Sequence, residues 1–255
     1  MSKPKVAFFD FAGCEGDQLQ IANLEERLLD IASHLEIVNF REVKTEQADN
    51  YDIAFIEGSI TRPEDEKRLK KIRKQAKMLI AMGACATIGG INCLKNFLGK
   101  QEYTSLVYGP YARHYSTYAT RPVRAVVPVD GEIHGCPIDK EEFVLVVKSL
   151  LLGKIYIPPD YPVCVECKKA GNICQLEQGR LCLGMITRAG CKATCISAGS
   201  VCWGCRGPVP GANLDAARQV IDEHGFSWLE AEDRFRLYLG YFLRLQGWVY
   251  EQETT

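Results

Sequence analysis

The sequence predicts an α/β protein with a parallel sheet, followed by a small irregular region that is rich in cysteine and ends in helices. Strand-like and helix-like patterns alternate from residue 5 to residue 152, as they do where helices connect parallel strands. Eight of the twelve cysteines lie between Cys164 and Cys205, in a stretch with many glycines and little periodicity. Helical periodicity returns after Gly211. These observations favour two parts with different architectures.

The elements of the first part follow one another in a regular order. Short apolar or β-branched segments predict strands, and apolar residues repeated at helical spacing predict helices. Strands are expected at residues 5–11, 35–40, 51–56, 77–82 and 123–129, and helices at residues 18–33, 62–75, 87–98 and 139–152. This alternation is typical of a doubly wound sheet of the flavodoxin-like type.

A proline-rich segment separates the two parts. The run Pro158-Pro159-Asp160-Tyr161-Pro162 interrupts any regular structure, so we expect one domain at residues 1–157 and a second at residues 158–255. The second domain has few residues that could form a core, and metal clusters would supply the missing stability. Its helices are expected at residues 214–223 and 228–248.

Composition excludes several classes of function. The 255 residues carry a formal net charge of -1, which gives no reason to expect nucleic acid or an anionic membrane as partner. The first ten residues do not form a signal peptide, and no run of eighteen apolar residues occurs. We therefore expect a cytoplasmic protein, in which clustered cysteines bind metal or act in redox chemistry.

Three of the four scattered cysteines are expected to meet. Cys14, Cys85 and Cys136 each follow a predicted strand and each lie near a glycine. Since the carboxyl ends of parallel strands share one edge of the sheet, these thiols should lie together and suit an iron–sulfur cluster. The alternative for each is a small buried apolar side chain, and Cys93, inside a predicted helix, is expected to have that role.

A cluster with four ligands needs one more donor beside these three cysteines. Asp17 stands three residues after Cys14, the spacing of a C-x-x-C pair with a carboxylate in place of the second thiolate. A carboxylate is a harder donor that can bind iron and would alter the potential of the cluster. The alternative is that Asp17 caps the following helix, and the residue pattern alone leaves both open.

The cysteine-rich segment offers eight further thiolates. Their spacing is C-x2-C-x6-C-x7-C-x8-C-x3-C-x6-C-x2-C, which divides into two sets of four. Both zinc and 4Fe-4S sites take four ligands, so a protein scaffold held by zinc is the alternative to a redox role. The nearby cations Arg188, Lys192 and Arg206 could offset thiolate charge, or could simply be solvated.

Several motifs together resemble a known family, the small electron-transferring subunits of cytosolic group 3 nickel–iron hydrogenases, which include sulfhydrogenase delta subunits. The resemblance covers nearly the whole chain. Its most specific pieces are Gly13-Cys14-Glu15-Gly16-Asp17-Gln18-Leu19-Gln20, Phe55-Ile56-Glu57-Gly58-Ser59, Gly83-Ala84-Cys85-Ala86, Gly135-Cys136-Pro137, Thr187-Arg188-Ala189-Gly190-Cys191 and Gly204-Cys205-Arg206-Gly207-Pro208.

The resemblance implies a flavodoxin-like domain with a proximal 4Fe-4S cluster, then a domain with medial and distal 4Fe-4S clusters. The implied ligands are Cys14, Asp17, Cys85 and Cys136 for the proximal cluster; Cys164, Cys167, Cys174 and Cys182 for the distal cluster; and Cys191, Cys195, Cys202 and Cys205 for the medial cluster. The family usually reads C-x-G-C where this chain has Cys14-Glu15-Gly16-Asp17, and the alignment favours ligation by Asp17. Cys195 completes a set for four medial irons, where some relatives hold three.

The same resemblance implies a function in electron transfer. The nickel site of such enzymes needs two C-x-x-C pairs near the ends of a separate large subunit, so this chain alone should not activate hydrogen. We expect it to relay electrons between that NiFe large subunit and flavin- or NAD(P)-binding and additional iron–sulfur subunits. A heterodisulfide reductase or polysulfide is the alternative acceptor. A quinone-linked subunit of complex I type and a flavodoxin-like FMN protein fit the cysteine pattern less well.

Overall fold

The computed structural model describes residues 3–245. Strands and helices alternate along the chain as far as Leu151. The strands are β1 (Lys5–Asp10), β2 (Glu36–Asn39), β3 (Ile53–Glu57), β4 (Met78–Met82) and β5 (Gly131–Ile133). The α-helices are α1 (Gly16–Ala22), α2 (Glu26–His34), α3 (Pro63–Gln75), α4 (Gly83–Ile88), α5 (Lys100–Tyr108), α6 (Lys140–Leu151), α7 (Val163–Lys169), α8 (Thr194–Ser197), α9 (Leu214–Glu223) and α10 (Trp228–Leu245). Three 3-10 helices complete the set: η1 (Gly90–Phe97), η2 (Gly109–His114) and η3 (Val123–Ala125). No helix among the described residues is long and apolar enough to cross a membrane.

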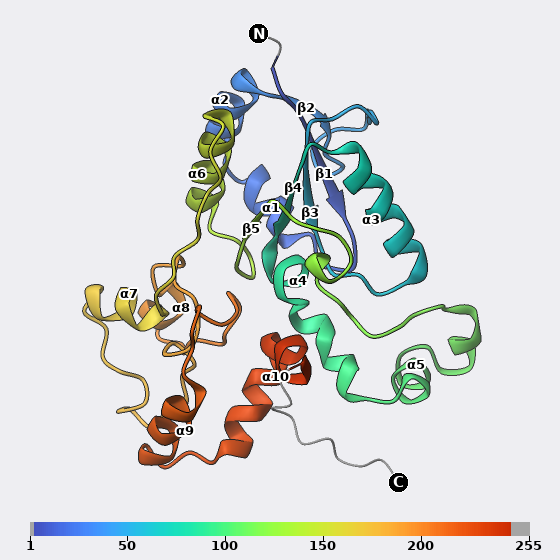
Figure 1. Ribbon diagram of the computed structural model, residues 1–255. Coiled ribbons are helices and arrows are strands. Elements are labelled where there is room, and N and C mark those ends of the chain that lie inside the picture. The colour runs from blue at the N-terminus through green and yellow to red at the C-terminus, as the bar shows by residue number, and fades with distance from the viewer. Residues whose placement is uncertain (1–2, 246–255) are drawn as a thin grey trace.

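The five strands form one parallel sheet in the order β2-β1-β3-β4-β5. This is the strand order of flavodoxin-like proteins, so the predicted fold class is confirmed. All five carboxyl ends lie at one edge of the sheet, and Figure 1 shows that this edge faces the region that contains α7, α8 and α10. Loops that leave this edge are where such folds bind ligands.

Helices cover both faces of the sheet and bury its apolar side chains. On one face, α1, α2 and α6 pack over a core that includes a group of four aromatic rings, and α3 covers the other face. The rings of Phe8 and Phe55 stack with centroids 5.0 Å apart, and Phe143 from α6 lies 5.4 Å from Phe55. Helix α6 begins where the Asp139 carboxylate accepts hydrogen bonds from the amides of Glu141 and Glu142.

The expected strand at residues 123–129 is wrong. Val123–Ala125 is a 3-10 helix, and the fifth strand is Gly131–Ile133. Pro122 precedes the expected segment and Pro128 lies within it, and proline cannot donate the backbone hydrogen bond that a central strand requires. Val123 and Val127 instead pack their side chains into the core.

Two expected helices are each divided. The helix predicted at residues 18–33 becomes α1 and α2, because Leu24 turns into the core and Glu25 adopts a φ of 53°. The helix predicted at residues 87–98 becomes α4 and η1, which meet at Gly89 and Gly90 with φ values of 85° and 57°. Helical periodicity continues through both breaks, which is why the sequence pattern did not reveal them.

The cysteine-rich region packs against the sheet region through its own apolar core. That core joins residues from α7 to α10 with Ala84 and Ile88 of α4. Helix α10 packs against η1 and α4, and a Cβ at Gly240 would lie 2.9 Å from the Phe97 ring. The predicted helices at residues 214–223 and from 228 onward are present, and the expected extension beyond residue 245 lies outside the described residues. Because the two regions share a core, the domain boundary at residue 157 stays a prediction.

Candidate functional site

The sheet edge brings together three of the scattered cysteines. Cys14 follows β1, Cys85 lies in α4 directly after β4, and Cys136 follows β5. Burial raises the pKa of the Cys85 thiol to about 12, with further contributions from Cys136, Asp17 and Cys14. Although the fifth strand is Gly131–Ile133 and not residues 123–129, Cys136 still lies at the same edge of the sheet.

Asp17 lies beside these thiols, inside the first turn of α1. Its Oδ1 accepts a hydrogen bond of 2.8 Å from the amide of Ile138, two residues after Cys136. A Cβ at Gly83 would collide with the Asp17 carboxylate, so the glycine gives this side chain its place. The residue that precedes α1 is Glu15. Asp17 is therefore not a helix cap, and one of its two expected roles is wrong.

Glu57, at the end of β3, holds the start of α1. Its two carboxylate oxygens accept hydrogen bonds from the amides of Asp17 and Gln18 at 3.1 and 3.0 Å, although only 2% of the residue is exposed. Burial, and next the nearby charge of Glu57, raises the pKa of Asp17 to about 7. Two carboxylates thus meet in a poorly solvated place, an arrangement that a bound cation would stabilise.

A second group contains Cys164, Cys167, Cys174 and Cys182. The first two lie on α7, one helical turn apart. Burial raises the pKa of Cys164 to about 11, followed by the charges of Cys182, Cys167 and Cys174. Gly184 leaves room for this group, since a Cβ there would lie 3.4 Å from the Cys164 sulfur. The four residues come together although eighteen positions separate the first from the last.

A third group contains Cys191, Cys195, Cys202 and Cys205. These four cysteines line a single cavity of about 380 Å³, together with Cys136, Arg206 and Tyr238. Burial raises the pKa of Cys205 to about 12, and it also raises the pKa of Cys202. Thiols held protonated by burial become ligands when a metal replaces the proton.

Close contacts connect the three groups in series. Cys136, in the sheet-edge group, lines the same cavity as Cys205 of the third group, and next to burial the charge of Cys136 contributes to the raised pKa of the Cys205 thiol. The amide of Cys202, in that third group, donates to the sulfur of Cys182 in the second group over 3.3 Å. The group at Cys191–Cys205 therefore lies between the other two.

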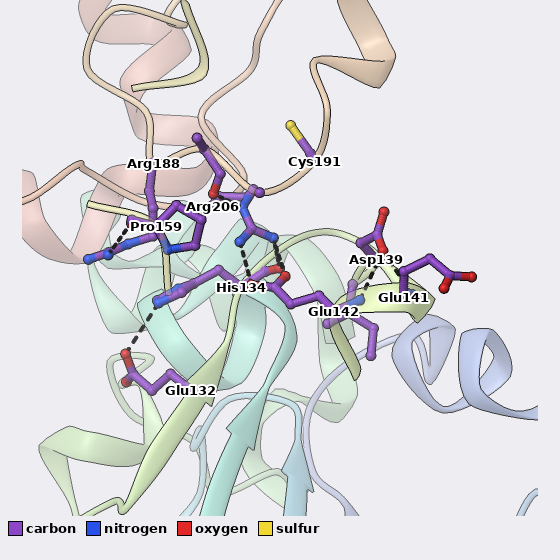
Figure 2. A network of polar contacts seen from close by, with 12 residues as sticks. Glu132, His134, Asp139, Glu141, Glu142, Pro159, Arg188, Cys191 and Arg206 are labelled. Atoms are coloured by element: carbon purple, nitrogen blue, oxygen red, sulfur yellow. Dashed lines mark hydrogen bonds and ion pairs between the residues drawn. The ribbon is translucent and has the colours of Figure 1, made fainter. Parts of the chain in front are cut away.

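Of the three cations noted in the sequence, Arg206 has the most unexpected position. Lys192 is exposed and pairs with Asp139 at 3.4 Å, and Arg188 is half-buried and donates to the carbonyl of Pro159. Arg206 is only 1% exposed and forms an ion pair with Glu142 at 2.8 Å (Figure 2). The interpretation of Arg206 as a solvated surface cation is wrong.

Cys93 lies apart from all three groups. It is fully buried, as predicted, near Gly89 and the carbonyl of Thr120. Within residues 3–245, no three His, Cys, Asp or Glu side chains stand close enough together to hold one metal ion.

Comparison with known proteins agrees with this geometry. Residues 14–150 match the family of the NADH ubiquinone oxidoreductase 20 Kd subunit. Sulfhydrogenase 2 subunit delta of Pyrococcus furiosus is 35% identical over 222 residues, which cover 86% of this chain and 92% of the relative. A vhu subunit of the F420-non-reducing hydrogenase of Methanocaldococcus jannaschii is 32% identical over 273 residues, 91% of this chain and 92% of the relative. The chain belongs to the small subunits of NiFe hydrogenases.

Solved structures show the same fold for the hydrogenase small subunit. The present chain matches a chain of an NAD+-reducing NiFe-hydrogenase with a TM-score of 0.54 and 26% identity. The match covers 62% of the present chain and 96% of the solved one. The matched family model ends before Cys164, while the relatives align along most of the chain. The eight-cysteine region is therefore shared with hydrogenase subunits, and a quinone-linked subunit of complex I type is the weaker interpretation.

Small subunits of this family bind iron–sulfur clusters and transfer electrons, and the residues present fit such groups. Eleven cysteines and one buried carboxylate form three sets of four. Thiolates are the donors that iron–sulfur clusters require. The carboxylate of Asp17, held between Ile138 and Gly83, lies beside the sheet-edge cysteines.

Sequence reasoning missed the residues that support these sets. Glu57, Glu142 and Tyr238 received no role, although Glu57 follows four apolar strand residues, an unusual place for an acid. Tyr238 on α10 lines the same cavity as Cys136, and it opposes the rise in pKa that burial gives the Cys136 thiol. No local signal marks Tyr238, because a tyrosine in an amphipathic helix has the pattern of an ordinary core residue.

Proposed function

We propose that this small subunit passes electrons, one at a time, through three 4Fe-4S clusters between a NiFe large subunit and a redox partner. The proposed partner is a flavin- or NAD(P)-linked subunit, with or without additional iron–sulfur subunits. The relative from Cupriavidus necator is described as an NAD-reducing hydrogenase subunit and is 26% identical over 64% of this chain, which supports this choice of partner.

The proposed ligands follow the three groups. The proximal set is Cys14, Asp17, Cys85 and Cys136; the medial set is Cys191, Cys195, Cys202 and Cys205; and the distal set is Cys164, Cys167, Cys174 and Cys182. Bound clusters supply one-electron redox chemistry. The chain itself supplies the burial that excludes water from most of the thiols and a hydrogen bond from the amide of Cys202 that stabilises the Cys182 sulfur.

The serial order of the groups is the observation that carries this proposal. Cys136 and Cys205 line one cavity, and the amide of Cys202 donates a hydrogen bond to the Cys182 sulfur over 3.3 Å. Neighbouring sites this close suit electron transfer, whereas metal sites that only stabilise a fold have no need to touch. Each group also has an exposed cysteine, such as Cys14 in the first and Cys174 in the last, so both ends of the series can be reached by a partner.

Anaerobic purification tests the proposal against a zinc-stabilised scaffold. We expect a brown protein with about twelve irons and about twelve acid-labile sulfides per chain, which are reduced when hydrogen is supplied to the complex. A colourless protein with about two zinc ions and no labile sulfide would contradict it. Removal of iron with a chelator should destabilise residues 158–210, because eight of the proposed ligands lie there.

Asp17 gives the sharpest test of the ligand set. We expect Asp17→Cys to keep the full iron content and to shift the potential of the proximal cluster, because a thiolate donates more electron density than a carboxylate. Asp17→Ala should lose iron from the proximal site. Glu15→Gln is the matched control, since it removes a carboxylate two residues away that the proposal does not use. If Asp17→Ala keeps its iron and an unchanged proximal EPR spectrum, Asp17 is not a ligand.

A further inference from the structure

Arg206 places a permanent positive charge at the wall of the central cavity. The residue follows Cys205 directly, lines the same cavity as the four cysteines of the third group, and is 1% exposed. A guanidinium stays protonated throughout the pH range of proteins. A charge that is buried to this degree acts through a poorly screened medium, so it affects its neighbours more strongly than a surface cation does.

The guanidinium is held rigidly by four acceptors. Its Nη1 and Nη2 donate to the two carboxylate oxygens of Glu142 at 2.8 and 2.9 Å. Its Nε donates to the carbonyl of Ala189 at 2.7 Å, and Nη1 also donates to the carbonyl of His134. Tyr156 donates to the Glu142 carboxylate at 3.0 Å. Such a bidentate pair is strong and fixed in orientation.

The pair lies between the two regions of the molecule. Glu142 and His134 belong to the sheet region, and Ala189 and Arg206 to the cysteine-rich region. Figure 2 shows Glu142 on one side of the guanidinium and Cys191 on the other. Burial raises the pKa of the Cys191 thiol, and the charge of Arg206 opposes that rise. The positive end of the pair is therefore turned toward the cysteines.

A glycine makes room for this arrangement. Gly190 has a φ of 114°, and a Cβ at this position would collide with the Arg206 guanidinium. The residue directly before Cys191 thus allows the cation to approach the loop that carries this cysteine. The close approach requires the glycine and the acceptors that hold the Arg206 guanidinium in place.

We propose that Arg206 raises the reduction potential of the medial cluster and that Glu142 attenuates this effect. The inference rests on the proposed function, because it takes Cys191, Cys195, Cys202 and Cys205 as ligands. One-electron reduction adds one negative charge to the medial site and no proton; the electron arrives from the proximal site and leaves to the distal site. A nearby cation favours the more negative state, and a nearby anion opposes it.

Glu142→Gln in the intact hydrogenase complex is the deciding variant. It removes the counter-charge while Arg206 keeps its bonds to two carbonyls. We expect the medial potential to rise, with about a tenfold change in the ratio of reduced to oxidised cluster at a fixed potential, or about 59 mV for one electron. An EPR-monitored redox titration measures the medial, proximal and distal signals in one sample, and the iron content is measured alongside.

The double substitution Arg206→Met with Glu142→Met should move the medial potential in the opposite direction. It removes both charges, so no unpaired ion is left buried, and the nearer cation contributes more than the carboxylate. A pair with only a structural role would not give shifts of opposite sign. Arg206→Lys keeps the charge and should keep most of the potential.

Lys192→Gln is the matched control, because Lys192 follows Cys191 directly but 67% of its side chain is exposed. Solvent and salt screen such a charge, so we expect little change in potential. The inference is overturned if Glu142→Gln leaves the medial potential unchanged, shifts it downward, or loses the medial cluster. A wild-type protein without clusters would instead contradict the proposed electron-transfer function. Failure of the inference about Arg206 can therefore be distinguished from failure of the proposed function.

Discussion

At the scale of single residues, the site is built from buried polar groups that support the cysteines. Asp17, Glu57, Glu142 and Arg206 are each 7% exposed or less. Burying a charge costs free energy unless partners compensate it. Glu57 and Glu142 are compensated by amides or by a cation. The amide of Ile138 compensates Asp17 in part, and we propose that iron does the rest.

Tyr238 gives a prediction at this scale. It lines the same cavity as Cys136 and opposes the rise in pKa that burial gives that thiol, so its hydroxyl is placed to donate to this sulfur when a cluster is bound. A hydrogen bond to a ligand sulfur stabilises the reduced cluster. Tyr238→Phe should therefore lower the potential of the proximal cluster by tens of millivolts, since a hydrogen bond to a charged group contributes about 1.5–3 kcal/mol at most. Redox titration of the variant measures this. Tyr241→Phe, on the same helix, is the control, and equal potentials in both variants would contradict the prediction.

At the scale of elements, the junction of β4 and α4 decides where the proximal set forms. The strand ends at Met82, and the helix begins at Gly83 with a φ of 84°. This left-handed backbone turns Cys85 toward the sheet edge and leaves room for Asp17. Glycine adopts such a φ without the penalty that other residues have.

Gly83→Ala should damage this junction. The added Cβ would collide with the Asp17 carboxylate, so we expect a loss of about 1–3 kcal/mol in unfolding free energy and of iron from one cluster. Gly153→Ala is the control, because Gly153 has a φ of 66° and open space around its Cβ. It should cost about 1 kcal/mol and keep all the iron. Anaerobic denaturation with parallel iron analysis compares them, and equal iron in both would contradict this role of Gly83.

At the scale of the whole molecule, α10 joins the cysteine-rich region to the sheet. Its inner face packs into the core of the cysteine-rich region and against η1. Phe235 is 1% exposed, and its ring lies 5.5 Å from that of Trp228. The position of the third cysteine group relative to Cys136 therefore depends on packing that lies far from any cysteine in the sequence.

Phe235→Ala should weaken that packing strongly. Removing a buried aromatic side chain costs about 3–5 kcal/mol, so the unfolding midpoint should fall, and hydrogen exchange should accelerate in α9 and α10 before it does in the sheet. Leu229→Ala, on the same helix but 64% exposed, should change stability by no more than about 0.5 kcal/mol. Equal effects of the two substitutions would show that the helix does not depend on this core.

The sequence by itself determined the parallel α/β class, most element positions and the cysteines near the strand ends. The alternation of strand-like and helix-like patterns can be read from short segments of sequence, and so can the positions of Cys14, Cys85 and Cys136 after predicted strands. Such local patterns predict local structure well. It failed at residues 123–129, where apolar residues between two prolines pack without forming a strand. It also failed at Leu24 and at Gly89, where a helix breaks while its periodicity continues.

The resemblance implied which cysteine group is medial, but only the tertiary structure brought the three groups next to one another and buried Arg206. Both depend on contacts between residues that are far apart in the chain, such as Cys136 with Cys205 and Glu142 with Arg206. A charged side chain in a glycine-rich loop has the pattern of a solvated one, because nothing local reveals its distant partner. The spacing of the cysteines suggests candidate ligands, and long-range packing decides which cysteines become neighbours.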